Sequence, residues 1–409
     1  MTAMTLPLPS VNNYLAYKQH LLPHPGTAGV VQVTRDVVAL HATAAAGPYL
    51  SLWARVPGFQ RQALHDALYE HRALARVLCM RRTLHVVPGD EVPAFFQAYV
   101  ERHAAFEARQ QKFLLVETGL CEEAEAEAVL KQLQRRVLDL LAEHGPSTAR
   151  KINRAIPELG TRFHHSEGKK YAGTFSVGSR LIPGMCTLGL LIRARPRGTW
   201  RSNLHEYAIL SDWLPDVDLA SVTPPEAQAW LVRRYLAAFG PATPDDVQWW
   251  TGFSRGETQR ALEALGPAVT EASVEGLGDE YLMLADDAGR LRDFAPPAAP
   301  YVSFLPGLDP YIMGYHDRRR FLAPEHQARV FDRAGNATPT VWANGRVVGA
   351  WGQYKPTGSV VYGLFEPVSQ AQRALLQTRR RELEEFLDGE YLPPYTRTRF
   401  TRALPLPVA

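Results

Sequence analysis

Two segments of the chain share a local pattern that restricts the fold more than any other feature of the sequence. In residues 144–156 and again in residues 239–250, a helical stretch stops at Gly-Pro, a Ser or Thr follows closely, and an apolar periodicity of helical type resumes. Proline cannot continue a helix, whereas Ser and Thr cap the start of the next one. Each segment is therefore predicted to form a helix-turn-helix unit, and the two together an internal repeat.

Strand-like segments follow both units. After the second unit, Ser254 is expected to cap a further helix, and short strands follow within residues 269–284. The first unit ends in alternating segments, 189–195 and 205–210, which are joined by a basic turn. Helices followed by a small hairpin are typical of a winged helix.

A third copy is predicted near the N-terminus. A helix capped by Thr34 and running through Leu40 to Ala44 is expected, followed by helices over 48–55 and 60–71 and a hairpin over 74–88. The fold class is thus α+β and mainly helical, with three tandem winged helix-turn-helix domains, a helical connector and a C-terminal antiparallel, barrel-like β domain.

The predicted domain boundaries follow these patterns. A strong hairpin signal, Asn344-Gly345, lies in the β-rich part, and a helix is expected over 369–387. The predicted segments are winged helix 1 (1–92), the connector (93–123), a basic winged helix 2 (124–222), an acidic winged helix 3 (223–294) and the C-terminal β domain (295–409).

Composition excludes several classes of protein. Of 409 residues, 46% are hydrophobic, which is sufficient for more than one core. Cys79, Cys121 and Cys186 form no Cys-x-x-Cys pair, so neither a disulfide framework nor a thiolate zinc site is expected. Because no signal peptide and no run of ~18 apolar residues is evident, a cytoplasmic, nucleoid-associated protein without membrane contact is predicted. No evident dimerisation helix is present, and a monomer is expected.

Charged residues are distributed unevenly. The net charge is only +3, with 14 basic and 14 acidic residues in the first 148 positions. Residues 149–202 hold 11 basic and 2 acidic residues, residues 203–294 hold 6 and 16, and the remainder holds 14 and 10. A genome rich in Arg codons would explain why arginine is used more often than lysine. It does not explain why the basic residues are concentrated in one segment. A basic cluster is typical of polyanion binding, so residues 149–202 are predicted to contact double-stranded DNA.

The predicted DNA-binding residues are mostly in this segment, with two in the N-terminal hairpin. They are Arg81, Arg82, Arg150, Lys151, Arg154, Lys169, Lys170, Arg180, Arg193, Arg195, Arg197 and Arg201.

Three blocks of sequence resemble a known family. Residues 38–59, residues 80–85 (Met-Arg-Arg-Thr-Leu-His) and residues 304–318 (Phe-Leu-Pro-Gly-Leu-Asp-Pro-Tyr onward) are similar to the winged-helix DNA glycosylases. This bacterial family includes the azinomycin self-resistance and crosslink-repair enzymes, and the resemblance covers nearly the whole chain. It implies tandem winged helices, a C-terminal β domain and hydrolysis of the N-glycosidic bond of bulky N7-alkylated purines, in some members within interstrand crosslinks.

The family's catalytic motif, Gln-x-Gln or Gln-x-Asp, corresponds here to His41-Ala42-Thr43. A self-resistance subgroup carries His at the first position, whereas Thr43 departs from the pattern. The resemblance implies that His41 activates or orients a water, for which a neutral imidazole is suited near pH 7. The Thr43 hydroxyl can bond that water but cannot act as a base.

The expected helix complicates these roles. Residues two apart lean toward different faces of a helix, so both side chains reach one water only if the helix frays before Gly47-Pro48. A structural alternative stays open, in which His41 is a buried histidine at a helix end and Thr43 an ordinary polar neighbour.

Other candidates carry less weight. Thr83 and His85 lie in the second matched block and could line the site, or could be outward residues of a wing strand. Asp309 and Arg318 could pair with each other or contact the DNA backbone, and a structural role is favoured. His164-His165 is expected in a basic loop, with no metal.

Two tryptophans and two lysines complete the candidates. Trp249 and Trp250 are expected in the core. The lysines nearest to the motif in sequence, Lys18 and Lys112, are remote, so a monofunctional hydrolase without cofactor is predicted rather than a lyase that forms a Schiff base.

The leading hypothesis is therefore a DNA glycosylase that acts on bulky or cationic N7-alkylated purines in damaged duplex DNA. The alternatives are a catalytically inactive winged-helix protein that shields or senses damaged DNA, and a transcriptional regulator. Palindromic operator binding by a dimer would favour the regulator. Release of base from an N7-alkylated duplex distinguishes the enzyme from both.

Overall fold

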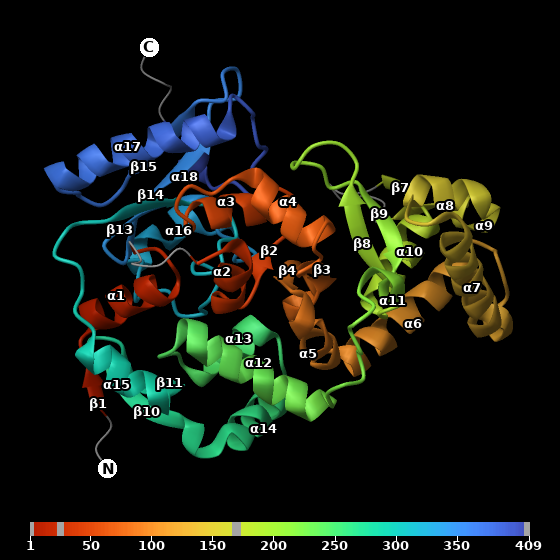
Figure 1. Ribbon diagram of the computed structural model, residues 1–409, viewed down its shortest axis with the longest axis horizontal. Coiled ribbons are helices and arrows are strands. Elements are labelled where there is room, and N and C mark those ends of the chain that lie inside the picture. The colour runs from red at the N-terminus through yellow and green to blue at the C-terminus, as the bar shows by residue number, and fades with distance from the viewer. Residues whose placement is uncertain (1–3, 23–27, 166–172, 405–409) are drawn as a thin grey trace. The chain divides into compact units, whose positions relative to one another are not determined.

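The structure is a computed structural model that describes residues 4–22, 28–165 and 173–404 (Figure 1). It is of the α+β class, with helices predominating, and its contacts divide it into two compact units. Unit 1 comprises residues 1–64, 85–87 and 228–409, and unit 2 comprises residues 65–84 and 88–227. The units cut across the five segments predicted from the sequence, and that five-part division stays a prediction. Among the described helices, none is long and apolar enough to cross a membrane.

Unit 1 contains the N-terminal and C-terminal elements. They are β1 (Met4–Leu6), α1 (Leu8–Lys18), α2 (Val30–Asp36), β2 (Leu40–His41), α3 (Gly47–Trp53), most of α12 (Pro224–Phe239), α13 (Pro244–Thr251), α14 (Arg255–Leu265), β10 (Val269–Val274), β11 (Gly278–Leu284), α15 (Ala285–Asp293), β12 (Val302–Leu305), α16 (Gln327–Val330), β13 (Thr340–Ala343), β14 (Arg346–Gln353), β15 (Val360–Leu364), α17 (Gln370–Leu387) and α18 (Arg399–Arg402), with 3-10 turns at Gly266–Ala268 and Pro324–His326.

Unit 2 contains the central elements. They are β3 (Leu74–Leu78), α5 (Val92–Gln97), α6 (Val100–Glu117), α7 (Ala126–His144), β5 (Ser147–Thr148), α8 (Ala149–Ala155), α9 (Pro157–Gly160), β6 (Arg162–His165), β7 (Gly173–Ser176), α10 (Gly178–Thr187), β8 (Leu191–Pro196), β9 (His205–Ile209) and α11 (Leu210–Trp213), with 3-10 turns at Met80–Arg82, Gly89–Glu91 and Glu123–Glu125. Helix α4 (Arg61–Tyr69) and strand β4 (Leu84–Pro88) contribute residues to both units.

The start and stop signals of the two repeated segments are confirmed. Helix α7 ends at His144, Gly145 has a left-handed φ of 71°, and the Thr148 hydroxyl accepts a hydrogen bond from the Lys151 amide at 3.3 Å. In the second segment the Thr243 hydroxyl caps α13 and the Ser254 hydroxyl caps α14 in the same way. Local capping chemistry therefore determines where these helices begin.

A hydrophobic core holds the basic part of unit 2 together. Helices α7, α8 and α10 bury apolar side chains against one another, among them Val137, Ile152, Leu181 and Met185. The adjoining sheet has the strand order β5-β9-β8, so the predicted strands around the basic turn are present and antiparallel. Truncation of such a side chain to alanine typically costs about 2–5 kcal/mol.

The C-terminal sheet is an open meander, which corrects the expected barrel. Its order is β12-β13-β14-β15, all antiparallel, and it does not close on itself within the described residues. The Asn344-Gly345 turn joins β13 to β14 as predicted, with both residues at positive φ. Helix α17 packs against strand β12, so a helix rather than strand closure shields the sheet.

The helix expected from Thr34 to Ala44 is wrong. Helix α2 already ends at Asp36, and the Thr34 hydroxyl donates to the Val30 carbonyl within that helix instead of capping it. The chain leaves the helix at Val38, which has a left-handed φ of 69°, and β2 follows. Val37 and Val38 are β-branched and therefore favour a strand over a helix. The backbones of Leu40 and His41 then pair with strand β4.

Candidate functional site

His41 lies in a short strand and pairs with His85. Strands β2 and β4 are antiparallel, and His41 is directly opposite His85 in the register. Their ring centroids are 4.9 Å apart with an interplanar angle of 60°, and only 9% of His41 and 7% of His85 is exposed. The structure thus brings together two predicted site residues that are 44 positions apart in the sequence.

Thr43 follows in the turn after β2. Its hydroxyl oxygen is buried and makes no hydrogen bond with the described part of the chain. A buried hydroxyl without a partner is uncommon, and a bound water or ligand would satisfy it. Gly47 closes the turn, because a Cβ there would lie 2.9 Å from the His41 carbonyl oxygen. The turn is therefore packed tightly against the backbone of His41.

The turn that precedes β4 is conformationally strained. Arg81 and Arg82 both have left-handed φ values, 51° and 55°, which cost free energy in residues other than glycine. Within unit 2, the Arg82 guanidinium lies 3.3 Å from the Phe106 ring centroid and donates to Glu107 at 2.8 Å. These contacts hold the turn, and they also mean that Arg82 already has an anionic partner inside the protein.

A buried ion pair missed by the sequence analysis anchors α3. The Arg55 guanidinium donates to both carboxylate oxygens of Asp309 at 2.7 and 2.8 Å, and both side chains are fully buried. The structural role expected for Asp309 is therefore supported, but its partner is Arg55 and not Arg318. Arg318 instead stacks on Phe331, 3.7 Å from the ring centroid. The only signal in the sequence was that Arg55 and Asp309 lie in two of the matched blocks.

Two buried histidines of unit 2 were also missed. Burial, with a smaller contribution from the Arg76 and Arg193 charges, lowers the pKa of His205 to about 3. Burial and the charges of Arg82 and Arg102 lower the pKa of His103 to about 4. Both imidazoles are therefore neutral at physiological pH and belong to the interior of unit 2.

The predicted DNA-binding residues differ in how available they are. Arg150, Lys151 and Arg154 are exposed on α8, and none of them forms an ion pair within the described residues. Arg180 and Arg201 are exposed as well.

Other predicted DNA-binding residues have partners or less exposure. Arg195 donates to both carboxylate oxygens of Glu70 at 2.5 and 2.9 Å, Arg197 lies 3.5 Å from Glu206, and Arg193 is half-buried. Lys169 and Lys170 lie outside the described residues.

The remaining candidates have ordinary structural partners. Thr83 donates to the Met80 carbonyl at 2.9 Å, and His164 bonds Thr174 at 3.0 Å across the β6–β7 hairpin. Trp250 packs between Tyr235 and Phe239, as predicted for the core.

Both lysines considered for lyase chemistry are engaged in ion pairs. Lys18 donates to Asp287 and to the Gly240 carbonyl, each at 2.9 Å, and burial lowers its pKa. Lys112 lies 3.2 Å from Glu127.

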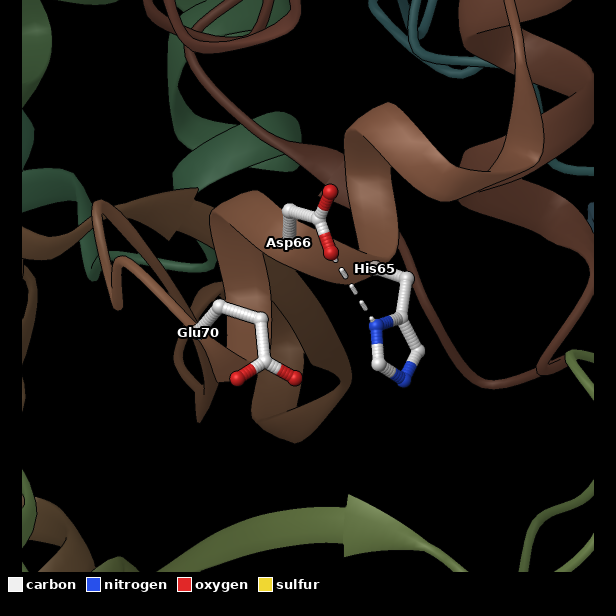
Figure 2. A group of neighbouring side chains, drawn as sticks. All are labelled: His65, Asp66 and Glu70. Atoms are coloured by element: carbon white, nitrogen blue, oxygen red, sulfur yellow. Dashed lines mark ion pairs between the residues drawn. The ribbon is translucent and has the colours of Figure 1, made fainter.

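One group of side chains at the end of α4 has metal-ligand chemistry. His65, Asp66 and Glu70 offer ligand atoms within 4.8 Å of one another (Figure 2). However, the Asp66 carboxylate already pairs with the His65 imidazole at 3.5 Å, and Glu70 accepts both hydrogen bonds from Arg195. The group is accounted for by these pairs, and we assign it no metal.

Unit 1 contains at least two cavities lined by described residues. The larger, of about 1000 Å³, is lined by residues of both charges, including Arg379, Glu382 and Glu385. The smaller, of about 340 Å³, adjoins the turn after Thr43, and its lining includes Ala44 and Gly47.

Comparisons with known proteins agree on one family. The model of the family described as AlkZ-like DNA glycosylases matches residues 34–386. A Streptomyces sahachiroi protein described as an interstrand DNA cross-link repair glycosylase is 33% identical over 132 residues, or 31% of this chain and 34% of that protein. The chain thus spans about a third of the length of the curated relative that it matches.

A solved structure shares the fold. The DNA glycosylase AlkZ of Streptomyces sahachiroi matches with a TM-score of 0.69 and 20% identity, covering 95% of this chain and 99% of that one. At this level of identity the likeness concerns the fold alone.

Proposed function

The chain belongs to the family of AlkZ-like DNA glycosylases, and from this premise we propose that it hydrolyses the N-glycosidic bond of bulky or cationic N7-alkylated purines in duplex DNA. The related Streptomyces protein, which is named for interstrand cross-link repair, supports crosslinked purines as a further substrate. The observation that carries the proposal within the fold is the buried His41–His85 pair beside the unsatisfied Thr43 hydroxyl.

We assign His41 the role of general base. An N7-alkylated purine carries positive charge, so it leaves without prior protonation. A water forms a bond to the sugar C1′ while the C1′–N9 bond breaks, and the bonding electrons neutralise the purine. The water's proton passes to an imidazole nitrogen of His41.

His85 and Thr43 position these groups. The His85 ring packs edge-on against the His41 ring and so restricts the orientation of the imidazole. The Thr43 hydroxyl can hold the water by a single hydrogen bond. Because β2 ends at His41 and Thr43 lies in the turn that follows, the two side chains are not held on different faces of a helix.

The proposed enzyme is a monofunctional hydrolase without a cofactor. The sequence separation of Lys18 and Lys112 from the His41–Thr43 motif supports the hydrolase, because a lyase needs an amine beside the reacting sugar. We further propose that the protein acts as a monomer on DNA of the cytoplasmic nucleoid.

We also propose that residues 1–92, 124–222 and 223–294 are three winged helices. In residues 124–222, helices α7, α8 and α10 precede the hairpin β8–β9, and in residues 223–294, helices α12 to α14 precede β10–β11. The exposed cations of α8 support DNA binding by the basic segment.

The decisive experiment measures base release from duplexes that contain one N7-methylguanine or one bulky N7-guanine adduct. Wild-type protein should generate alkali-labile abasic sites, and His41→Ala should lower the single-turnover rate by about 100-fold or more. Thr43→Ala should lower it less, and Thr43→Ser should restore it.

His316→Ala is the matched control, because this exposed histidine of unit 1 lies outside the His41–His85 pair. A wild-type protein that binds the duplexes but releases no base from any adduct would overturn the proposal and favour a protein that only shields damaged DNA.

A further inference from the structure

Part of the wall of the smaller cavity of unit 1 comes from the segment that follows Thr43. Ala44, Ala46, Gly47 and Leu50, which belong to the turn after Thr43 and to α3, line that wall. The rest of the wall includes residues of β14, β15 and the C-terminal segment 391–404. At about 340 Å³ the cavity is in the size range of small-ligand sites.

The charge of this cavity is entirely positive. Lys355, Arg397 and Arg402 line it, and no Asp or Glu does. In the described part of the chain none of the three forms an ion pair, and the hydrogen bond recorded for Arg397 goes to the Tyr391 hydroxyl at 2.8 Å. The larger cavity of unit 1, by contrast, contains Glu382 and Glu385 beside its arginines. The smaller cavity is therefore suited to an anion.

Aromatic side chains supply the second recognition element. Tyr354, Tyr391 and Tyr395 line the same cavity, and Tyr395 is 51% exposed, which is unusual for so large a ring. An exposed ring beside cationic groups is the combination with which proteins hold single nucleotides, by stacking on the base and pairing with the phosphate.

We propose that this cavity binds one nucleotide unit of a DNA strand, with its base stacked on Tyr395 and its phosphate held by Arg397 and Arg402. The inference rests on the proposed function in so far as the nucleotide comes from the damaged duplex. The alkylated purine itself is not the occupant, because a cationic base is repelled by three positive side chains. The cavity instead holds a neighbouring, undamaged nucleotide while the site after β2 acts.

Fluorescence of 2-aminopurine tests the cavity on the full-length protein. The probe is 2-aminopurine deoxyriboside 5′-phosphate, whose emission is quenched when the base stacks on an aromatic ring. Wild-type protein should quench it, and the same nucleoside without phosphate should bind at least about 10-fold more weakly. An Arg397→Ala, Arg402→Ala double variant should weaken binding by a similar factor, and Tyr395→Ala should remove the quenching.

Arg399→Ala is the matched control. Arg399 is exposed and shares the short helix α18 with Arg402, but it does not line the cavity. Absence of quenching up to about 10 mM probe, or equal binding of nucleotide and nucleoside, would overturn the proposal. So would equal losses in the control and the double variant.

A second arm repeats the nucleotide titration on protein already bound to a duplex that contains N7-methylguanine. Loss of the nucleotide's quenching in the presence of the duplex assigns the occupant to the DNA strand, whereas undiminished quenching would overturn that assignment. Base release is measured separately on the same proteins. Nucleotide binding without base release would contradict the proposed function and leave the cavity assignment standing. Base release without nucleotide binding would contradict the cavity assignment and leave the proposed function standing.

Discussion

The basic segment (residues 124–222) and the acidic segment (residues 223–294) share a local sequence pattern, but the helix that follows the pattern has different contacts in each. In each, a threonine caps the helix after Gly-Pro, Thr148 for α8 and Thr243 for α13. The third helical position differs, because it is an exposed Lys151 in the basic segment and a fully buried Asp246 in the acidic one. The shared pattern sets the backbone, and this one position sets what the helix start contacts.

The contacts of Asp246 show what the difference does. One carboxylate oxygen accepts the Thr243 amide at 3.1 Å, and the other accepts the His316 and Asp317 amides at 2.8 and 3.0 Å. The start of α13 is thus fastened to a distant loop of the same unit. No such carboxylate is present at the start of α8, whose exposed cations face solvent. One repeat is therefore built as scaffold, and the other leaves its helix available to a polyanion.

Removal of the Asp246 carboxylate should have the largest effect. Asp246→Ala leaves three part-buried backbone amides without their acceptor, and we expect a loss of about 4 kcal/mol in the free energy of unfolding. Urea unfolding followed by tryptophan fluorescence measures this loss. Asp245→Ala, at an exposed position of the same helix, should change stability by less than about 0.5 kcal/mol. Equal effects of the two variants would contradict the fastening role.

Charge reversal on α8 should have the next largest effect, on DNA affinity. Replacement of Arg150, Lys151 and Arg154 by Glu should weaken duplex binding by about 100-fold and reduce the salt slope by about 3, because three phosphate contacts are lost. Fluorescence anisotropy at several salt concentrations measures both quantities.

The matched reversal in the acidic segment is Arg255→Glu with Arg260→Glu, at exposed positions of α14. It should change affinity by no more than about twofold, because isolated charges in an acidic segment hold little phosphate. Unchanged affinity of the α8 variant, or equal loss in both, would remove the distinction between the two segments.

Structural features that depend on local chemistry could be predicted from the sequence. Caps by Thr148 and Ser254 and the Asn344-Gly345 turn were predictable, since each involves residues only a few positions apart. The failed prediction near Thr34 was also local in origin: an apolar periodicity suggested a helix, but pairing of Leu40 and His41 with a strand more than 40 residues away decided the outcome.

Features that depend on long-range contacts could not be predicted. The Arg55–Asp309 pair and the Asp246 contacts join residues 254 and about 70 positions apart, and no local pattern encodes them. The same is true of the cavity between α3 and segment 391–404. Of the candidate site, the resemblance indicated His41, Thr43 and His85 as separate residues, and only the fold brings His41 and His85 into contact.

Acid should destabilise the basic segment before the acidic one. The folded pKa of His205 is about 3, below its ordinary value near 6.5, so the unfolded chain binds a proton that the folded chain excludes. The unfolded chain is therefore favoured as the pH falls below ~6.5. The free energy of unfolding should decrease by about 2 kcal/mol between pH 8 and pH 5. Residues 223–294 contain no histidine.

The measurement is urea unfolding between pH 5 and pH 8. His205→Gln should flatten the dependence, whereas His144→Gln, at an exposed position, should leave it unchanged. A wild-type stability that stays constant between pH 8 and pH 5 would contradict the difference between the segments.

The smallest predicted effect concerns the cap of α8 itself, where stability and DNA binding can be separated at one residue. Thr148→Ala should cost about 1 kcal/mol of stability, because the Lys151 amide loses its acceptor. Thr148→Asp keeps the cap and should hold stability within about 0.5 kcal/mol, yet it adds an anion beside Arg150 and Lys151. We therefore expect about fivefold weaker DNA binding for Thr148→Asp, while Thr148→Ser retains wild-type affinity. If the aspartate variant bound DNA as well as the serine variant does, the start of α8 would not face the phosphates, and the contrast with α13 would be one of fold stability alone.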